Sequence, residues 1–226
     1  ILMSSFVLKI IAVITMFIDH LGYTIFGKFS YLNYIGRISF PIFAFQISEG
    51  YIHTKNLKKY FLRLFLFAVI SQIPFMLFHS IISDTFYLNI FFTLLLGLLS
   101  IYIYDKCKYK FIGILSGILL ALIAQFSNCD YGAYGVAIIL IFYIFKNNIF
   151  NSCIFFIFAT LIKYCIPCIK YGVFPKEYLY LFIGTIIPSL FFAAYNGKKG
   201  KDTKYLLYLF YPIHLILLYG FHLILK

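Results

Sequence analysis

Apolar stretches of about twenty residues follow one another along this chain, separated by short polar or charged segments. A helix needs roughly 20 apolar residues to cross a hydrocarbon core about 30 Å thick, where only intrahelical hydrogen bonds satisfy its backbone. The pattern therefore predicts a polytopic all-α bundle of about nine membrane-spanning helices. We place them at residues 5–26, 31–52, 60–79, 86–104, 111–127, 132–146, 149–169, 178–195 and 205–225. The sixth segment, residues 132–146, is short, so it is tilted, re-entrant or differently bounded.

The composition agrees with a membrane protein. Of all residues, 63% are hydrophobic and 12% are charged, whereas soluble domains carry about 25% charged residues. The first apolar stretch contains Asp19 and His20 and lacks a small-residue cleavage pattern, so we expect a span and not a signal peptide. No linker is long enough to separate two domains, and no internal repeat is visible. We therefore expect one transmembrane domain over residues 1–226, in a bacterial cytoplasmic membrane.

Lysine and arginine residues gather in alternate loops. With a cytoplasmic N-terminus, the inner loops hold Lys55, Lys58, Lys59, Arg63, Lys106, Lys108, Lys110, Lys146, Lys198, Lys199, Lys201 and Lys204. The outer loops hold only Lys28, Lys163, Lys170, Lys176 and Lys226. Because cytoplasmic loops are richer in Lys and Arg, this distribution predicts an N-in, C-out orientation. The net charge of +12 is then a topology signal and an attraction to anionic lipids, and we expect no nucleic-acid partner.

Five ionisable residues interrupt the first two apolar segments: Lys9, Asp19, His20, Arg37 and Glu49. A charge at the bilayer centre costs roughly 3 kcal/mol on insertion scales, so such residues indicate a functional site. If the two segments pair as an antiparallel hairpin, Asp19 and His20 come level with Arg37. Lys9 and Glu49 come level about 16 Å lower, at 1.5 Å rise per residue. The sequence thus predicts two polar layers on one helix pair.

Simpler roles stay open for the outlying residues. Lys9 can extend its amine to the cytoplasmic interface, and Glu49 and His53 are close enough to the inner surface to be interfacial. His214, near mid-depth in the last segment, either joins one of the two layers or only hydrogen-bonds a neighbouring helix.

Two other motifs give weaker indications of a functional site. Cys165 and Cys168 form a C-x-x-C, but a second pair is missing, so we expect no metal site. Gly113, Ser116 and Gly117 superficially suggest an intramembrane serine protease. Their spacing is one residue too long for the rhomboid pattern, so small-residue helix packing is the better interpretation.

Ordered motifs along nearly the whole chain carry a family resemblance. They occupy residues 9–12 and 18–20, then 36–45, 49–54, 70–75, 92–97, 130–132, 195–197 and 208–214. In these motifs the chain resembles the TraX family, membrane proteins named for N-terminal acetylation of a conjugative pilin subunit. That family is similar in turn to the acyltransferase-3 and heparan glucosaminide acetyltransferase enzymes. These show a basic residue, ten intervening residues and a His in the first span, the spacing of Lys9 and His20 here.

The resemblance implies an integral membrane N-acetyltransferase that moves an acetyl group from cytoplasmic acetyl-CoA to an amine. The expected acceptor is the N-terminus of a membrane-inserted or secreted peptide. The expected acetyl-CoA-binding residues, whose cations neutralise phosphates, are Lys9, Arg37, Lys55, Lys58 and Lys59. The expected catalytic residues are His20 as general base, Asp19 or Glu49 adjusting its protonation, Arg37 for a carbonyl or oxyanion, and His214.

Two alternatives stay open. Transfer is either direct or through an acetyl-His intermediate. A proton- or ion-coupled transporter would also place ionisable groups in the membrane, but it would more often show internal repeats and broken helices, and neither is evident in the sequence.

Overall fold

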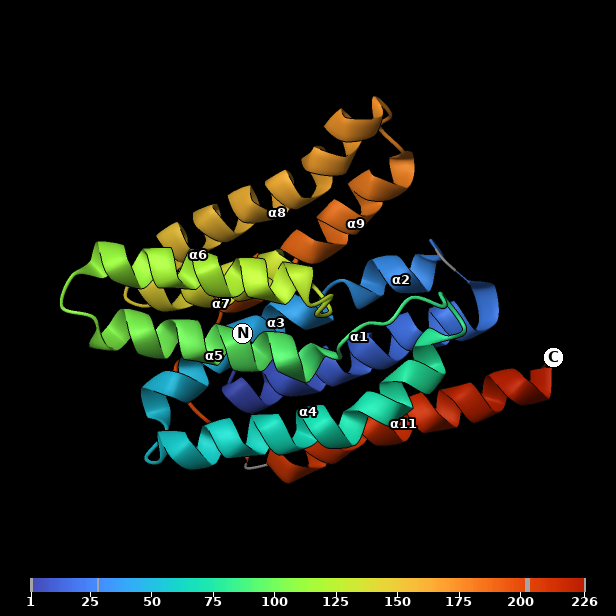
Figure 1. Ribbon diagram of the computed structural model, residues 1–226, viewed down its shortest axis with the longest axis horizontal. Coiled ribbons are helices and arrows are strands. Elements are labelled where there is room, and N and C mark those ends of the chain that lie inside the picture. The colour runs from blue at the N-terminus through green and yellow to red at the C-terminus, as the bar shows by residue number, and fades with distance from the viewer. Residues whose placement is uncertain (1, 28, 202–203, 226) are drawn as a thin grey trace. The chain divides into compact units, whose positions relative to one another are not determined.

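The computed structural model describes residues 2–27, 29–201 and 204–225, so Lys28 and Lys226 of the predicted outer set lie outside the described residues. Within these ranges the chain forms eleven helices (Figure 1). They are α1 (Ser5–Phe26), α2 (Tyr31–Gly36), α3 (Ser39–His53), α4 (Leu57–His79), α5 (Ile90–Lys106), α6 (Lys110–Phe126), α7 (Gly132–Ile144), α8 (Ile149–Tyr171), α9 (Lys176–Ile186), α10 (Pro188–Ala193) and α11 (Lys204–Leu225). Each predicted segment is helical, and most bounds agree within a few residues.

The second and eighth predicted segments are not single helices, which corrects the expectation of uninterrupted spans. The second is α2 and α3, divided at Arg37 and Ile38, and the eighth is α9 and α10, divided at Ile187. Pro41 has no N–H to donate to the Arg37 carbonyl, and its ring crowds that carbonyl, so it is favoured in the first turn of a new helix. Pro188 begins α10 for the same reason.

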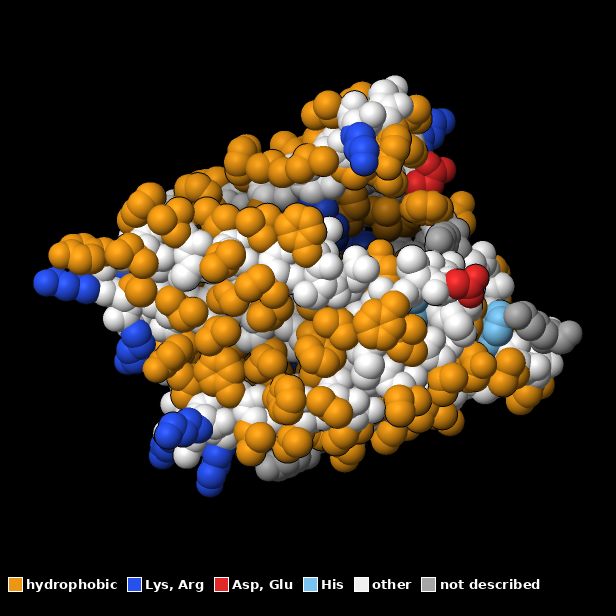
Figure 2. Space-filling model, in the orientation of Figure 1, with side chains coloured by type: hydrophobic (Ala, Val, Ile, Leu, Met, Phe, Trp, Pro, Cys, Tyr) orange, Lys and Arg blue, Asp and Glu red, His pale blue; other side chains and the backbone are white. Residues whose placement is uncertain are grey.

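Several helices are suited to a bilayer, which marks a multi-pass membrane protein. Within the described residues, five segments have the length and apolarity to cross it: α1, α4, α8, Lys176–Ala193 and Tyr208–Leu225. The helices α6 and α7 are apolar but shorter. Figure 2 shows hydrophobic side chains covering the visible surface of α5 and α6. Nine crossings and the N-in, C-out orientation stay predictions.

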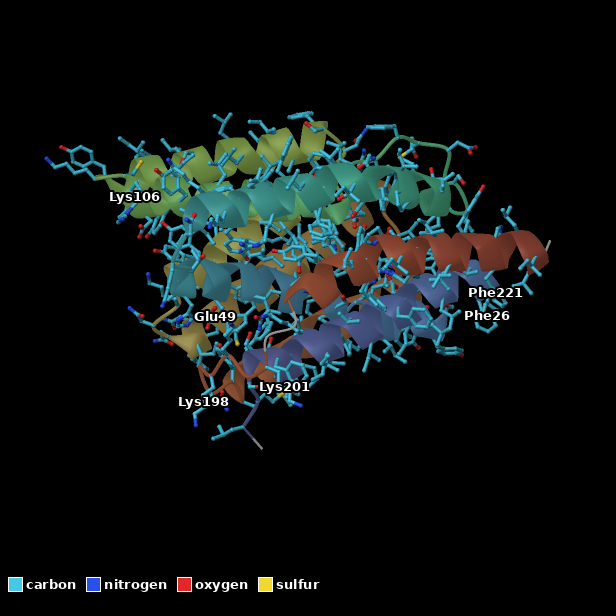
Figure 3. The ribbon with its side chains drawn as sticks, turned by 90° about the horizontal axis from the view of Figure 1, so that it is seen from below. Phe26, Glu49, Lys106, Lys198, Lys201 and Phe221 are labelled. Carbon is cyan, nitrogen blue, oxygen red and sulfur yellow. The ribbon has the colours of Figure 1, made fainter. Side chains whose placement is uncertain are left out.

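The chain divides into two compact units, each described by itself. The first comprises Ile1–Phe43, Pro74–Asp84 and Cys153–Lys226. In it α1 packs against α2 and α11, and α2 packs against α9. The backbone N–H of Ser5 donates to the Lys198 carbonyl (2.8 Å), so the basic loop 198–201 lies at the start of α1. Figure 3 shows Lys198 and Lys201 at this end and Phe26 and Phe221 at the opposite one.

The second unit comprises Ala44–Ile73 and Thr85–Ser152 and is built around α5, α6 and α7. At one end, Tyr51 and Tyr143 donate to the Asp105 carboxylate at 2.9 and 2.6 Å, which joins the ends of α3, α5 and α7. The loops that follow these ends carry the lysines predicted to be cytoplasmic. At the other end, Thr93 donates to the Asp130 carbonyl. The sidedness of these loops stays a prediction.

Replacing Gly184 with alanine tests the contact between α9 and α2. A Cβ at this position would overlap the Tyr34 carbonyl oxygen. Because backbone cannot yield as a side chain can, we expect a loss of about 1–3 kcal/mol of stability, measured as thermal unfolding in detergent. The matched control is Gly220→Ala on α11, where a Cβ meets nothing within 4 Å and helix propensity gains up to about 1 kcal/mol. Equal melting of both variants would contradict the contact.

Candidate active site

A buried ion pair joins α1 to the break between α2 and α3. The Arg37 Nη2 lies 2.5 Å from Asp19 Oδ2, and the Asp19 residue is only 7% exposed. Asn33 donates its side-chain amide to the Asp19 carbonyl (2.9 Å) and to Oδ1 (3.2 Å), while Arg37 Nε donates to the Asn33 carbonyl (3.3 Å). The predicted alignment of Asp19 with Arg37 is confirmed. Asn33 orients both ends of the pair.

Local sequence explains why the two helices approach so closely. A Cβ at Gly36 would overlap the Asp19 side chain, and one at Gly22 would lie 2.7 Å from Ser30 Oγ. Ser30 and Asn33 form a reciprocal capping box that starts α2. The glycines therefore let α2 lie directly on α1, and the cap fixes Asn33 over Asp19.

A histidine pair lies one residue further along α1. His20 Nδ1 is 2.7 Å from His214 Nε2, and the two rings stack with centroids 5.0 Å apart. His214 is 2% exposed, and its Nδ1 lies 2.7 Å from the Phe210 carbonyl oxygen. Of the two layers considered for His214, the structure brings it to the one that contains His20.

The Phe210 carbonyl fixes which nitrogen carries each proton in the neutral pair. A carbonyl only accepts hydrogen bonds, so His214 Nδ1 must be the protonated nitrogen, and its Nε2 is then an acceptor. His20 Nδ1 must in turn donate to that acceptor. This leaves the lone pair on His20 Nε2, which makes no hydrogen bond within the described part of the chain. The chain of bonds thus presents one basic nitrogen in a defined direction.

Aromatic rings contact both histidines. The Phe78 ring centroid lies 4.9 Å from that of His20, and Phe210 stacks on His214 at 4.7 Å. Arg37 is near enough to act electrostatically on His20. A base between aromatic rings, beside a guanidinium, suits reactions in which a proton leaves a nucleophile while negative charge develops on an oxygen.

Three further polar side chains lie at the site although the sequence did not single them out, and one of them, Tyr23, has its hydroxyl 3.5 Å from Arg37 Nη2. Asn33 had a local signal, because it follows Ser30 at capping-box spacing. Tyr164 of α8 had none: it hydrogen-bonds Thr185 of α9 (3.0 Å) and lies near enough to interact electrostatically with Arg37 and Asp19. Its place depends on packing between segments far apart in the chain.

The other predicted site residues lie elsewhere. Lys9 is half-buried on α1, eleven residues before His20 and in the first unit. Glu49 belongs to the second unit, where its carboxylate lies 3.5 Å from His53 Nε2. Also in the second unit, and exposed, are Lys55, Lys58 and Lys59. The predicted pairing of Lys9 with Glu49 stays a prediction. Residues 2–27, 29–201 and 204–225 contain no group of three His, Cys, Asp or Glu that could hold a metal ion.

The family model described as TraX protein matches residues 4–222. The chain belongs to the TraX family. One relative, the probable fimbrial assembly protein FimC, serogroup H1, of Dichelobacter nodosus, is 33% identical over an alignment of 232 positions, which covers 95% of this chain and 94% of the relative. No solved structure matches. The TraX match includes Asp19, His20, Arg37 and His214, so the whole geometry described above lies within the family region.

Proposed function

We propose that this TraX protein is a membrane N-acetyltransferase that moves the acetyl group of acetyl-CoA to the terminal amine of a membrane-inserted or secreted peptide. One observation carries the proposal: the contacts from the Phe210 carbonyl through His214 to His20 Nδ1 leave His20 Nε2 as the basic nitrogen, and Arg37 is near enough to act electrostatically on His20. The name of the relative, a fimbrial assembly protein, fits a pilin-like acceptor. A resemblance to the acyltransferase-3 enzymes, through Lys9 and His20, belongs to the same proposal.

The phosphates of acetyl-CoA bind at the basic end of the first unit. Lys9 lies on the α1 turn next to this end, and the loop carrying Lys198, Lys199 and Lys201 begins beside Ser5. Lysine ammonium groups neutralise phosphates at such a rim. From there the pantetheine arm follows α1 towards His20, about 16 Å away at 1.5 Å per residue. Lys55, Lys58 and Lys59 belong to the second unit, and their part in binding acetyl-CoA rests on the sequence prediction alone.

The reaction is an acyl transfer in which atoms and charge balance. The neutral amine attacks the thioester carbonyl carbon, a C–N bond forms, and His20 Nε2 takes the proton that leaves the nitrogen. His214 shares the resulting positive charge through its hydrogen bond to His20. The C–S bond then breaks, and the departing CoA thiolate receives the proton from His20. In the two-step variant, His20 Nε2 attacks the thioester carbonyl carbon and the CoA thiolate leaves. The amine then attacks the acetyl carbon, the C–N bond to His20 breaks, and the amine proton passes to the thiolate.

Arg37 stabilises the oxyanion that forms on the thioester oxygen. A preorganised cation at such a point acts without reorganisation at the moment of reaction. Asp19 and Asn33 are positioning residues, because they hold the guanidinium in one orientation. Glu49, whose carboxylate lies 3.5 Å from His53 Nε2, is a candidate for adjusting protonation at the predicted cytoplasmic side.

A second candidate function, ion- or proton-coupled transport, is favoured by one observation. Two predicted spans are interrupted, and their outer halves, α2 and α9, pack against each other. Interrupted helices with ionisable groups are typical of transport sites. In proteoliposomes a transporter would accumulate its substrate against a gradient without consuming acetyl-CoA.

Binding of acetyl-CoA by the purified protein tests the proposed enzyme. We expect acetyl-CoA to raise the melting temperature in detergent, because a ligand that binds only the folded state stabilises it by mass action. In Lys9→Ala, about tenfold or more acetyl-CoA should be needed for the same rise in melting temperature, because one phosphate contact is lost. Lys170→Ala, which removes a cation from the predicted outer end, is the matched control. A protein that no acyl-CoA stabilises, and that transfers no acetyl group to any peptide, would contradict the proposal.

A further inference from the structure

A ladder of tyrosine rings lies between α2 and α9, at the end of the first unit opposite Lys198 and Lys201. The Tyr34 ring is 5.2 Å from the Tyr180 ring and 6.2 Å from the Tyr31 ring, centroid to centroid. Tyr31 is 83% exposed and Tyr180 is 47% exposed, so their ring faces are accessible. The ladder lies at this end because α2 begins there: Ser30, its N-cap, lies beside Gly22 in the last part of α1.

A carboxylate accompanies these rings. Glu177 lies in the first turn of α9, three residues before Tyr180, and therefore on the same helix face. It is near enough to Tyr34 to act on it electrostatically. No hydrogen bond or ion pair joins Glu177 to another residue within the described ranges. Its charge is thus available to a ligand.

The ladder leads to the buried ion pair. Gly184, seven residues after Glu177, faces the Tyr34 carbonyl, and a Cβ there would lie 3.4 Å from the Arg37 Cβ. On α2, Tyr34 and Arg37 are three residues apart and share a face. The two rows therefore run parallel, from Glu177 and Tyr34 at one end to Gly184 and Arg37 at the other, and Arg37 is near enough to act electrostatically on His20.

Electron-rich ring faces and an unpartnered carboxylate recognise an organic cation. Ammonium groups bind over tyrosine faces, the more strongly where water is excluded, and a carboxylate adds charge and hydrogen bonds. A phosphate or carboxylate ligand would instead be repelled by Glu177. An interfacial aromatic belt explains isolated exposed tyrosines. It does not require rings in mutual contact between two helices, with an acid at one end and a guanidinium at the other.

We propose that Glu177 with Tyr31, Tyr34 and Tyr180 forms the entry site for the protonated terminal amine of a peptide acceptor. The inference rests on the proposed acetyltransferase and assigns the place where its amine acceptor, still protonated, first binds. The two ends of the first unit then have complementary tasks: lysines receive an anionic co-substrate, and the acid and rings receive a cationic acceptor. Near Arg37 a second cation is disfavoured, so the ammonium releases its proton to water at the exposed end. The neutral amine then passes on to His20.

Peptide binding without acetyl-CoA tests the entry site separately from catalysis. The probes are the hydrophobic peptide amide Ala-Leu-Leu-Ala-Leu with a free N-terminus and the same peptide N-acetylated. Binding to the full-length protein in detergent at pH 7 is measured by isothermal titration calorimetry. We expect the free amine to bind about tenfold tighter than the acetylated peptide, a difference of about 1.4 kcal/mol.

Substitutions distinguish the contribution of the Glu177 charge to amine binding from that of the Tyr180 ring and from general effects on folding. Glu177→Gln should reduce the preference for the free amine to about twofold or less, and Tyr180→Leu should reduce it partly, because each removes one attraction to the cation. Tyr180→Phe keeps the ring and should keep the preference. Asp84→Asn removes an exposed acid in the same unit and serves as the matched control. Equal binding of both peptides to the unsubstituted protein, or an unchanged preference in Glu177→Gln, would overturn the inference. Retained preference without any acetyl transfer would instead overturn the proposed function alone.

Discussion

His20→Gln is expected to lower acetyl transfer by about 10²- to 10⁴-fold, the range typical for loss of a general base. The glutamine amide can still hydrogen-bond to His214. It has no nitrogen basic enough to take the amine proton. Folding should be little affected, because His20 is only part-buried and its Nε2 makes no bond in the described structure. The measurement is transfer of labelled acetyl to a peptide amine at saturating acetyl-CoA, with melting temperature measured in parallel.

His214 acts through His20, so its variants should behave differently. His214→Leu leaves His20 Nδ1 without an acceptor, and His20 then adopts either tautomer. His214→Gln supplies an acceptor for His20 and a donor for the Phe210 carbonyl, so it should recover a large part of the activity. Nitrogen-15 NMR of labelled histidine should show His20 protonated at Nδ1 in the unsubstituted protein and a mixture in His214→Leu. Full activity of His20→Gln, or a His20 protonated at Nε2, would contradict the assigned base.

The sequence was sufficient to predict the polar layer of the first hairpin. Charged residues in apolar segments are costly, so Asp19, His20 and Arg37 were conspicuous, and helical rise alone brings Asp19 level with Arg37. His214 was conspicuous for the same reason, but its partner depended on how the last helix packs. Only the structure shows that its Nε2 meets His20 Nδ1.

The sequence was least informative where proline chemistry and tertiary packing decide. Pro41 and Pro188 each lie within stretches apolar enough to be taken as one span, and the hydropathy pattern conceals the helix breaks beside them. Tyr180 and Glu177 are ordinary interfacial residues in the sequence. They become a candidate site because Gly184 allows α9 to approach the Tyr34 carbonyl. Hydrophobic periodicity reports burial in lipid or protein and does not report which helices become neighbours.

Neutralising one member of the Asp19–Arg37 pair should cost more stability than neutralising both. Asp19→Asn leaves a guanidinium in a low-dielectric site, and Arg37→Gln leaves a carboxylate there. Removing one partner of a buried pair typically costs about 3–5 kcal/mol, because the other charge remains desolvated and uncompensated. In the double variant two neutral amides face each other and can hydrogen-bond. Its thermal stability in detergent should therefore exceed that of either single variant, which is a coupling that a double-mutant cycle measures.

In the Asp19–Arg37 double-mutant cycle, the rate of acetyl transfer should not recover when thermal stability does. This difference separates the role of Arg37 in joining the helices from its role in stabilising the oxyanion. The double variant retains the contact between α1 and α2 but has no cation beside His20, so transfer should stay about 10²- to 10³-fold below that of the unsubstituted protein. Asp84→Asn, an exposed acid outside the site, controls for a general effect of lost charge. If the double variant regained both stability and transfer, Arg37 would serve only to join the helices. The oxyanion would then need another donor, for which the Tyr23 hydroxyl, 3.5 Å from Arg37 Nη2, is a candidate.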